Sequence, residues 1–133
     1  MDEHKVLTKL VYLLVHADGQ VDPKELAMCE HLVLYEKMSE AHFVAHLEDL
    51  KGTCKKQLTQ VCIEELKDLG KETQERFVAW AFLLANSDGI MDNAEWDLIF
   101  TIYHKGLQLS NRPIMEQQQE LWTAISKRKR LAA

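Results

Sequence analysis

The sequence contains little glycine, little proline and few cysteines. Its 133 residues include 5 Gly, 2 Pro and 3 Cys, while 47% of the residues are hydrophobic. A chain this apolar is not disordered, and its length suits one packed domain. We therefore expect residues 1–133 to form a single domain.

The cysteines and the hydrophobic runs restrict the compartment. Cys29, Cys54 and Cys62 are odd in number and form no CxxC pair, which favours a reduced protein. Charged and polar residues 2–5 stand where the apolar core of a signal peptide would begin. The longest apolar run, 77–85, is well short of the roughly 20 residues of a membrane helix. We expect a cytoplasmic protein with no membrane partner.

Positive charge is also scarce. With 16 Lys plus Arg and 21 Asp plus Glu, the formal net charge is -5. Four of the positive charges form the run 127–130, so the body without that run carries -9. This balance argues against nucleic acid as a partner, and it favours cationic over anionic partners for the body.

Apolar residues recur at helical spacing almost throughout, and no long stretch alternates with period two. The chain therefore predicts an all-α fold, with Ser39 and Ser110 as N-caps and Pro113 in a first turn. Each of the five glycines ends a periodic stretch, as expected of left-handed C-terminal caps. Short connections favour a single compact bundle. The predicted helices are 3–17, 23–37, 40–50, 54–69, 72–87, 93–105 and 111–128.

The chain repeats itself with an offset of 70 residues. The alignment continues beyond the second helix if Gly106 is counted as a one-residue insertion, because Met38-Ser39 then meets Leu109-Ser110. The sequence thus predicts two related helix-turn-helix units joined by the helix at 54–69. The matched pairs are Leu13 and Leu83, Leu14 and Leu84, Asp18 and Asp88, Gly19 and Gly89, Asp22 and Asp92, and Glu25 and Glu95.

The repeated core is an acidic turn, Asp-Gly-x-h-Asp-x-x-Glu, at 18–25 and 88–95. Joining two helices explains most of it. The second Asp followed by Glu makes a capping box, Pro23 suits a first helical position, and Val21 or Met91 suits a hydrophobic staple. Capping does not explain Asp18 or Asp88, since a carboxylate at a helix C-terminus opposes the helix dipole. A compensating cation is the alternative.

The residues of each acidic turn match the second half of a calcium-binding loop, with acids at positions 5, 9 and 12 of that loop. The first half is missing, because Leu14 and Leu84 stand where its first ligand would be. A single turn would then hold calcium or magnesium weakly, unless water or the other turn completes the coordination. Capping alone and capping with a cation site are both open. The candidate metal ligands are Asp18, Asp22, Glu25, Asp88, Asp92 and Glu95.

The strings 17–25 and 87–95, each followed by an amphipathic helix and a Met-Ser or Leu-Ser step, resemble the TerB-like (tellurite-resistance protein B) family. The resemblance covers about residues 12–115. It implies an all-helical bundle of about seven helices, with the acidic residues of both turns on one face. It also implies binding of metal or partner proteins in stress response. The chain departs from the pattern at His16, Asn86 and Ser87, where small residues are commoner.

Other candidate sites are weaker. His42 and His46 have the spacing of helical zinc ligands, but Phe43, Val44 and Ala45 lie between them instead of a glutamate base. The large aromatic residues predict the core of the second unit more than a ligand cage. They are Trp80, Phe82, Trp96, Phe100, Tyr103 and Trp122.

The sequence thus predicts a non-enzymatic binding module whose acidic turns hold a divalent cation, calcium or magnesium, and support recognition of protein partners. The alternative is a metal-free helical interaction scaffold in which the six acids are caps and a negative surface. A metal-dependent hydrolase with His16 as its base ranks third.

Overall fold

The computed structural model describes residues 3–17, 23–87 and 92–132, with side chains to residue 128. These residues form α-helices and one π-helical turn, and no strand, which confirms the all-α prediction. The helices match the predicted ranges within two residues, except that α7 continues to Ala132 and that 93–105 is divided between α6 and η1. The elements are α1 (Glu3–Val15), α2 (Pro23–Tyr35), α3 (Glu40–Leu50), α4 (Lys55–Lys67), α5 (Lys71–Ala85), α6 (Asn93–Phe100), η1 (Thr101–Gly106) and α7 (Asn111–Ala132).

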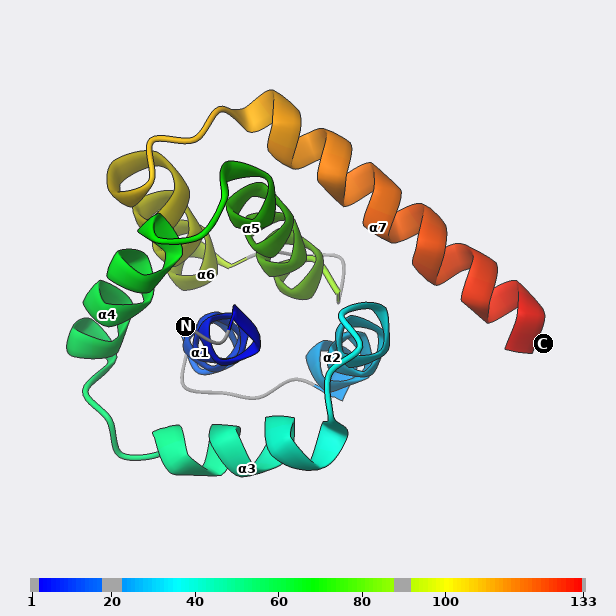
Figure 1. The fold of residues 1–133 in the computed structure, drawn as a ribbon, viewed down its shortest axis with the longest axis horizontal. Helices are drawn as coiled ribbons and strands as arrows, with labels where there is room; N and C mark the ends of the chain where they lie inside the picture. The colour runs from blue at the N-terminus through cyan, green and yellow to red at the C-terminus, as the bar shows by residue number, and fades with distance from the viewer. Residues whose placement is uncertain (1–2, 18–22, 88–91, 133) are drawn as a thin grey trace.

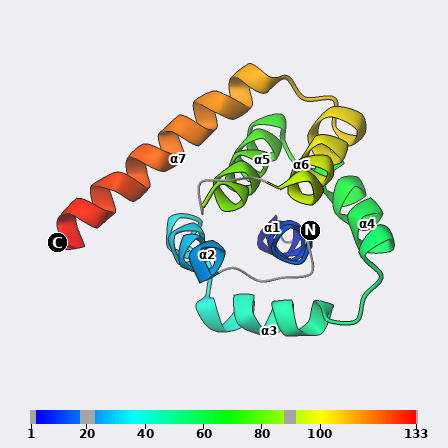
Figure 2. The same ribbon diagram turned by 180° about the vertical axis from the view of Figure 1, so that it is seen from behind.

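Helix α1 is the centre of the bundle. Every residue from Val6 to Val15 is buried except Lys9, which is half-buried and forms an ion pair with Glu65 of α4. A helix buried on all its faces must be covered from all sides. Accordingly α1 contacts α3, α4, α5 and α6, and it lies in the middle of the ring of helices in both opposite views (Figures 1 and 2).

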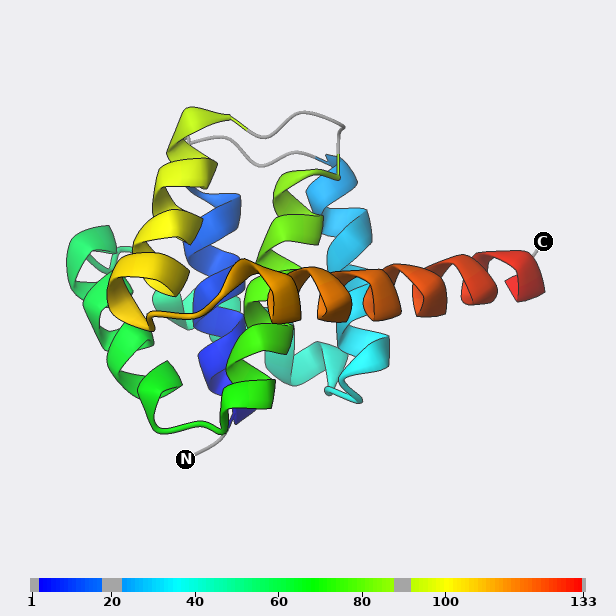
Figure 3. The ribbon, with the colours of Figure 1, turned by 90° about the horizontal axis from the view of Figure 1, so that it is seen from above.

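Helix α5 is the second buried helix. It contacts α1, α2 and α6 on the inside and α7 on the outside. Phe77 and Trp80 are its largest fully buried side chains. Helix α7 lies across α5, and its C-terminal part extends past α2 (Figures 1 and 3). The basic run 127–130 lies in this last part of α7. No helix in the described part of the chain is both long and apolar enough to cross a bilayer.

A polar network joins the end of α2 to α5. The carboxylate of Glu36 accepts hydrogen bonds from Arg76 Nε at 2.9 Å and from Arg76 Nη2 at 3.1 Å, and a third from Trp80 Nε1 at 3.0 Å. Burial opposes the charge of Arg76, but the hydrogen bond and charge of Glu36 outweigh it and raise the pKa of Arg76. A bidentate pair of this kind fixes both position and orientation.

The helix caps agree with the sequence only in part. The Ser39 side chain accepts from His42 N at 3.3 Å, which confirms the N-cap of α3. Gly52 has a φ of +84°, as expected of a left-handed cap. For Gly70 and Gly106 the prediction is wrong, because Gly70 is the N-cap of α5 with a φ of -62° and Gly106 lies within η1. Gly19 and Gly89 lie outside the described residues.

Two other residues occupy the left-handed positions at helix ends. Lys37 after α2 has a φ of +57°, and Gln108 after η1 has a φ of +55°. At the end of α2, Met38 N donates to Val33 O and Lys37 N donates to Leu34 O, which is the Schellman pattern. The sequence did not reveal these positions because glycine is absent from both.

Gly106 is required by a close approach instead. A Cβ atom at this position would lie 2.9 Å from Cγ2 of buried Ile63, on α4. Gly106 ends η1, and a π-helical turn contains one residue more than an α-helical turn. The missing side chain therefore lets η1 pack directly against α4, which η1 contacts.

The predicted aromatic core is confirmed in part. Trp80 and Tyr103 are buried, and Phe82 and Phe100 are half-buried against the core. Trp96 and Trp122 are exposed by 43% and 47%, so their assignment to the core is wrong. Trp96 covers Phe82 and Phe100 with ring centroids at 6.2 Å and 6.0 Å and leaves its other side to solvent.

Replacing Lys37 by glycine should stabilise the protein. A non-glycine residue is destabilised by about 1 kcal/mol in the left-handed region, and glycine avoids this cost. Glycine also has more freedom in the unfolded chain, which offsets part of the gain. We expect Lys37→Gly to raise the free energy of unfolding in urea by about 0.5 kcal/mol. Lys37→Ala is the control, since it removes the same side chain but keeps Cβ. An equal gain in both variants would contradict the backbone explanation.

Candidate functional site

The four helix ends that flank the two acidic turns lie at the same end of the molecule. Helices α1 and α5 end there, and α2 and α6 begin there (Figure 3). We call this region the acidic end. Among its predicted ligands Glu25, Asp92 and Glu95 are described by the structure. Asp18, Asp22 and Asp88 lie outside the described residues.

The second acidic turn contains the predicted capping box. Asp92 has extended backbone angles, φ -79° and ψ 169°, and its Oδ1 accepts from Glu95 N at 2.8 Å. Glu95 Oε1 accepts in return from Asp92 N at 3.4 Å. Both carboxylates therefore satisfy N–H groups at the start of α6, as the capping interpretation requires.

The first acidic turn is described from Pro23 onward. Pro23 occupies the first position of α2, as predicted. Glu25 follows in the first turn and is only 7% exposed, close to the 6% of Glu95 at the matching position. The charge of Glu25 adds to the effect of burial, which raises the pKa of Cys29 to about 12. A buried carboxylate is thus present at the start of both helices.

No third metal ligand joins His42 and His46 among the described residues. No group of three or more His, Cys, Asp or Glu side chains within the described ranges could hold a metal ion. His42 and His46 both lie on α3, as their spacing predicts, with His42 exposed and His46 half-buried. Three of the six candidate acids lie outside these ranges. A cation site at the acidic end therefore stays a prediction.

His16 follows the end of α1, near the acidic end. Its ring contacts that of Tyr12 with centroids 4.4 Å apart, and its backbone oxygen accepts a hydrogen bond from Lys55 Nζ. Burial and the charges of Lys55 and Lys51 lower the pKa of His16. These effects favour the neutral imidazole, which has two lysines near it.

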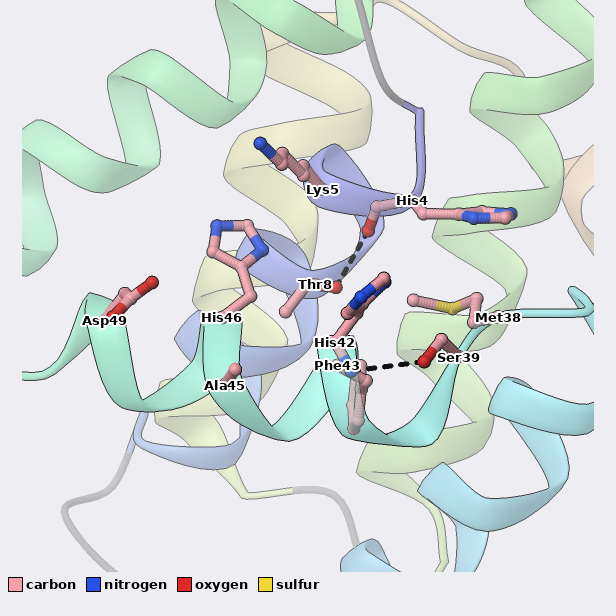
Figure 4. A pocket seen from close by; sticks show the side chains of 10 residues that line it. All are labelled: His4, Lys5, Thr8, Met38, Ser39, His42, Phe43, Ala45, His46 and Asp49. Atoms are coloured by element: carbon pink, nitrogen blue, oxygen red, sulfur yellow. Dashed lines mark hydrogen bonds between the residues drawn. The ribbon is translucent and has the colours of Figure 1, made fainter.

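A hollow that the sequence did not reveal lies between α1 and α3 (Figure 4). Its volume is about 470 Å³. Only the spacing of His42 and His46 pointed to this face, because the residues from α1 are distant in sequence. The polar side chains that line it include His4, Lys5, Ser39, His42, His46 and Asp49.

A second groove of about 440 Å³ lies between α2, α5 and α7. Its walls combine apolar side chains, Met28 from α2, Leu83 from α5, and Met115 and Trp122 from α7, with polar ones that include Ser87, Gln118 and Gln119. Met115 and Trp122 are exposed, so the groove is open to solvent along α7. Asn86 also lines the groove, just before the second acidic turn.

The capping role of Asp92 gives a direct prediction. Asp92→Ala removes the acceptor for Glu95 N and should lower the free energy of unfolding by about 1 kcal/mol without metal. Asp92→Asn keeps an acceptor of nearly equal capping strength, so it should cost much less. Chemical denaturation of both variants in chelator checks this. Equal losses in the two variants would show that the charge, and not the cap, stabilises α6.

The three cysteines should differ in reactivity. Cys54 is exposed at the start of α4, where hydrogen bonds from the backbone of Gln57 and Lys56 lower the pKa of its thiol. Burial raises the pKa of Cys29 and of Cys62 to about 12. Because the thiolate is the nucleophile, iodoacetamide at pH 7.5 should modify Cys54 first, as peptide mass spectrometry would show. Prior modification of Cys29 or Cys62 in folded protein would contradict this order.

Comparison with known proteins does not place the chain in a family. No family model matches the sequence, and neither a curated protein nor a solved structure is significantly similar to it. The resemblance of the two acidic turns to TerB-like proteins therefore stays a prediction.

Proposed function

We propose that this chain is a non-enzymatic, TerB-like binding module of the cytoplasm. Its acidic end binds calcium or magnesium and couples the ion to recognition of a protein partner. The candidate ligands are the carboxylates of both turns, Asp18, Asp22, Glu25, Asp88, Asp92 and Glu95.

The observation that carries the proposal is the pair of buried glutamates at the acidic end. Glu25 and Glu95 lie in the first turns of α2 and α6, both buried. Carboxylate oxygens are the ligands that calcium and magnesium prefer, and two buried carboxylates at one end of the molecule can contribute to such a site. The capping box engages Glu95 through one hydrogen bond to its Oε1.

The proposed repeat explains why the two turns match. Lys37 and Gln108 correspond in the alignment once Gly106 is counted as an insertion, and both have positive φ. The extra residue falls in η1, where a π-helical turn can accommodate it. These two features support two related helix-turn-helix units whose acidic turns serve one function.

Exposed apolar residues beside the buried glutamates support a partner surface. Leu26 follows Glu25 and is 51% exposed, and Trp96 follows Glu95 and is 43% exposed. The two positions correspond in the repeat. Tryptophan is a frequent anchor at protein interfaces. With a body charge of -9, the partner surface should be basic.

A metal-free interaction scaffold is the second candidate. The capping box of Asp92 and Glu95 favours it, because these two acids already have a structural role without an ion. In this case the acidic end would contact its partner by charge alone.

Thermal unfolding of chelator-treated protein, titrated separately with calcium, magnesium, manganese and zinc, tests the proposal. A bound ion at about 100 times its dissociation constant adds about 2.7 kcal/mol and should raise the midpoint by about 5–10 °C. We expect this rise with calcium or magnesium, and its loss in the double variant Asp18→Asn with Asp88→Asn.

The control variant is Asp68→Asn with Glu116→Gln, which removes two exposed negative charges away from the acidic end. It should respond to metal like the unmodified protein. A flat response to all four ions at millimolar concentration would refute the cation site and leave the scaffold.

A further inference from the structure

The hollow between α1 and α3 lies away from the acidic end. It is lined by His4, Lys5 and Thr8 at the start of α1, whereas the acidic end is near the finish of that helix. Thirteen residues of α-helix separate the two ends of α1 by about 20 Å. The hollow is therefore a separate candidate site, and its ligand is independent of any ion at the acidic turns.

Most of the polar side chains that line the hollow can donate a hydrogen bond. His4, His42 and His46 each carry at least one ring N–H, whether neutral or protonated. Lys5 adds a full positive charge and forms no ion pair within the described ranges, whereas Lys9 one turn later is paired with Glu65. In a chain of net charge -5, this is a local surface suited to an anion.

The start of α3 brings the positive end of a helix dipole to the hollow, and the Glu40 carboxylate in the first turn opposes part of it. Ser39 and His42 line the hollow at the N-terminus of this helix, where the helix dipole is positive. Ser39 Oγ satisfies the N–H of His42, so the cap is in place without a ligand. The N-terminus thus adds to the charge of Lys5 and the donors of the histidines.

The directions of the side chains favour a small molecule over a single metal ion. The rings of His4, His42 and His46 point in different directions, and Asp49 lies at the other end of α3 from Ser39 (Figure 4). Ten residues of helix place these ends about 15 Å apart. The absence of a metal-binding group from the described residues agrees with this spread.

The size and the apolar wall set the class of ligand. Phe43 and Met38 provide apolar surface beside the donors. A hollow of about 470 Å³ lies within the usual range of small-molecule sites. An ionised Asp49 carboxylate accepts hydrogen bonds and cannot donate them. A ligand that contacts Asp49 must therefore present a donor at that end of the hollow.

We propose that this hollow binds a small phosphate monoester. Its phosphate lies beside the start of α3 and accepts hydrogen bonds from His42 and, once its exposed side chain turns toward the start of α3, from Lys5. The apolar part of the ligand packs against Phe43, and a donor group of the ligand faces Asp49.

Titration of the histidine ring signals by NMR tests the site, in buffer with chelator so that an ion at the acidic end plays no part. The probes are inorganic phosphate, AMP and adenosine, the last of which lacks the phosphate. We expect saturable shifts of His4, His42 and His46 with phosphate and AMP below about 10 mM, no response to adenosine, and no shift of His104 on η1.

Variants at exposed positions test the named contacts. Lys5→Gln and His42→Gln should each weaken AMP binding about tenfold, the effect of losing one hydrogen bond to a charged group. Asp49→Asn should not weaken the binding of inorganic phosphate. Lys105→Gln, an exposed lysine beside Phe100, is the matched control and should leave binding unchanged.

Three results would overturn the proposal. They are the absence of a saturable shift in the unmodified protein, an equal response to adenosine, and zinc binding by the three histidines without any response to phosphate. Each is read from the unmodified protein, so a variant that fails to fold does not affect the outcome. None of them bears on the metal response at the acidic turns, which is measured separately.

Discussion

The burial of α1 on all its faces is the constraint on which the rest of the bundle depends. An apolar helix with no solvent face cannot lie at a surface, so α3, α4, α5 and α6 must surround it. Helix α5 is buried almost as completely, and α2 and α7 are needed to cover its remaining sides. The Glu36–Arg76–Trp80 network then fixes the end of α2 against α5 with directional bonds.

This central pair also explains where ligands could bind. Because α1 and α5 end at the same end of the molecule, α2 and α6 both begin there and bring Glu25 and Glu95 to it. The start of α1 lies at the other end, where α3 crosses it and the histidine-lined hollow is formed. One helix thus separates an acidic region from one rich in donors, and the two suit ligands of opposite charge.

Local signals predicted the helices well because they act within a few residues. Ser39 caps α3, Pro23 begins α2, and Asp92 with Glu95 forms the capping box, all as the sequence indicated. The glycines were less informative, since glycine tolerates several environments. Gly70 is the N-cap of α5, and Gly106 allows close contact with Ile63. The left-handed positions after helices are occupied by Lys37 and Gln108 as well.

The sequence by itself determined an all-helical bundle, the approximate ends of its helices, and the repeated acidic turns, because periodicity and capping are properties of neighbouring residues. Only the tertiary structure decided which residues distant in sequence meet. It buried Trp80 but left Trp96 and Trp122 exposed, although all three follow helical periodicity. It also brought His4 of α1 to the same hollow as His42 and His46 of α3. Burial and proximity depend on which helix faces pack together, and helical spacing alone does not specify that choice.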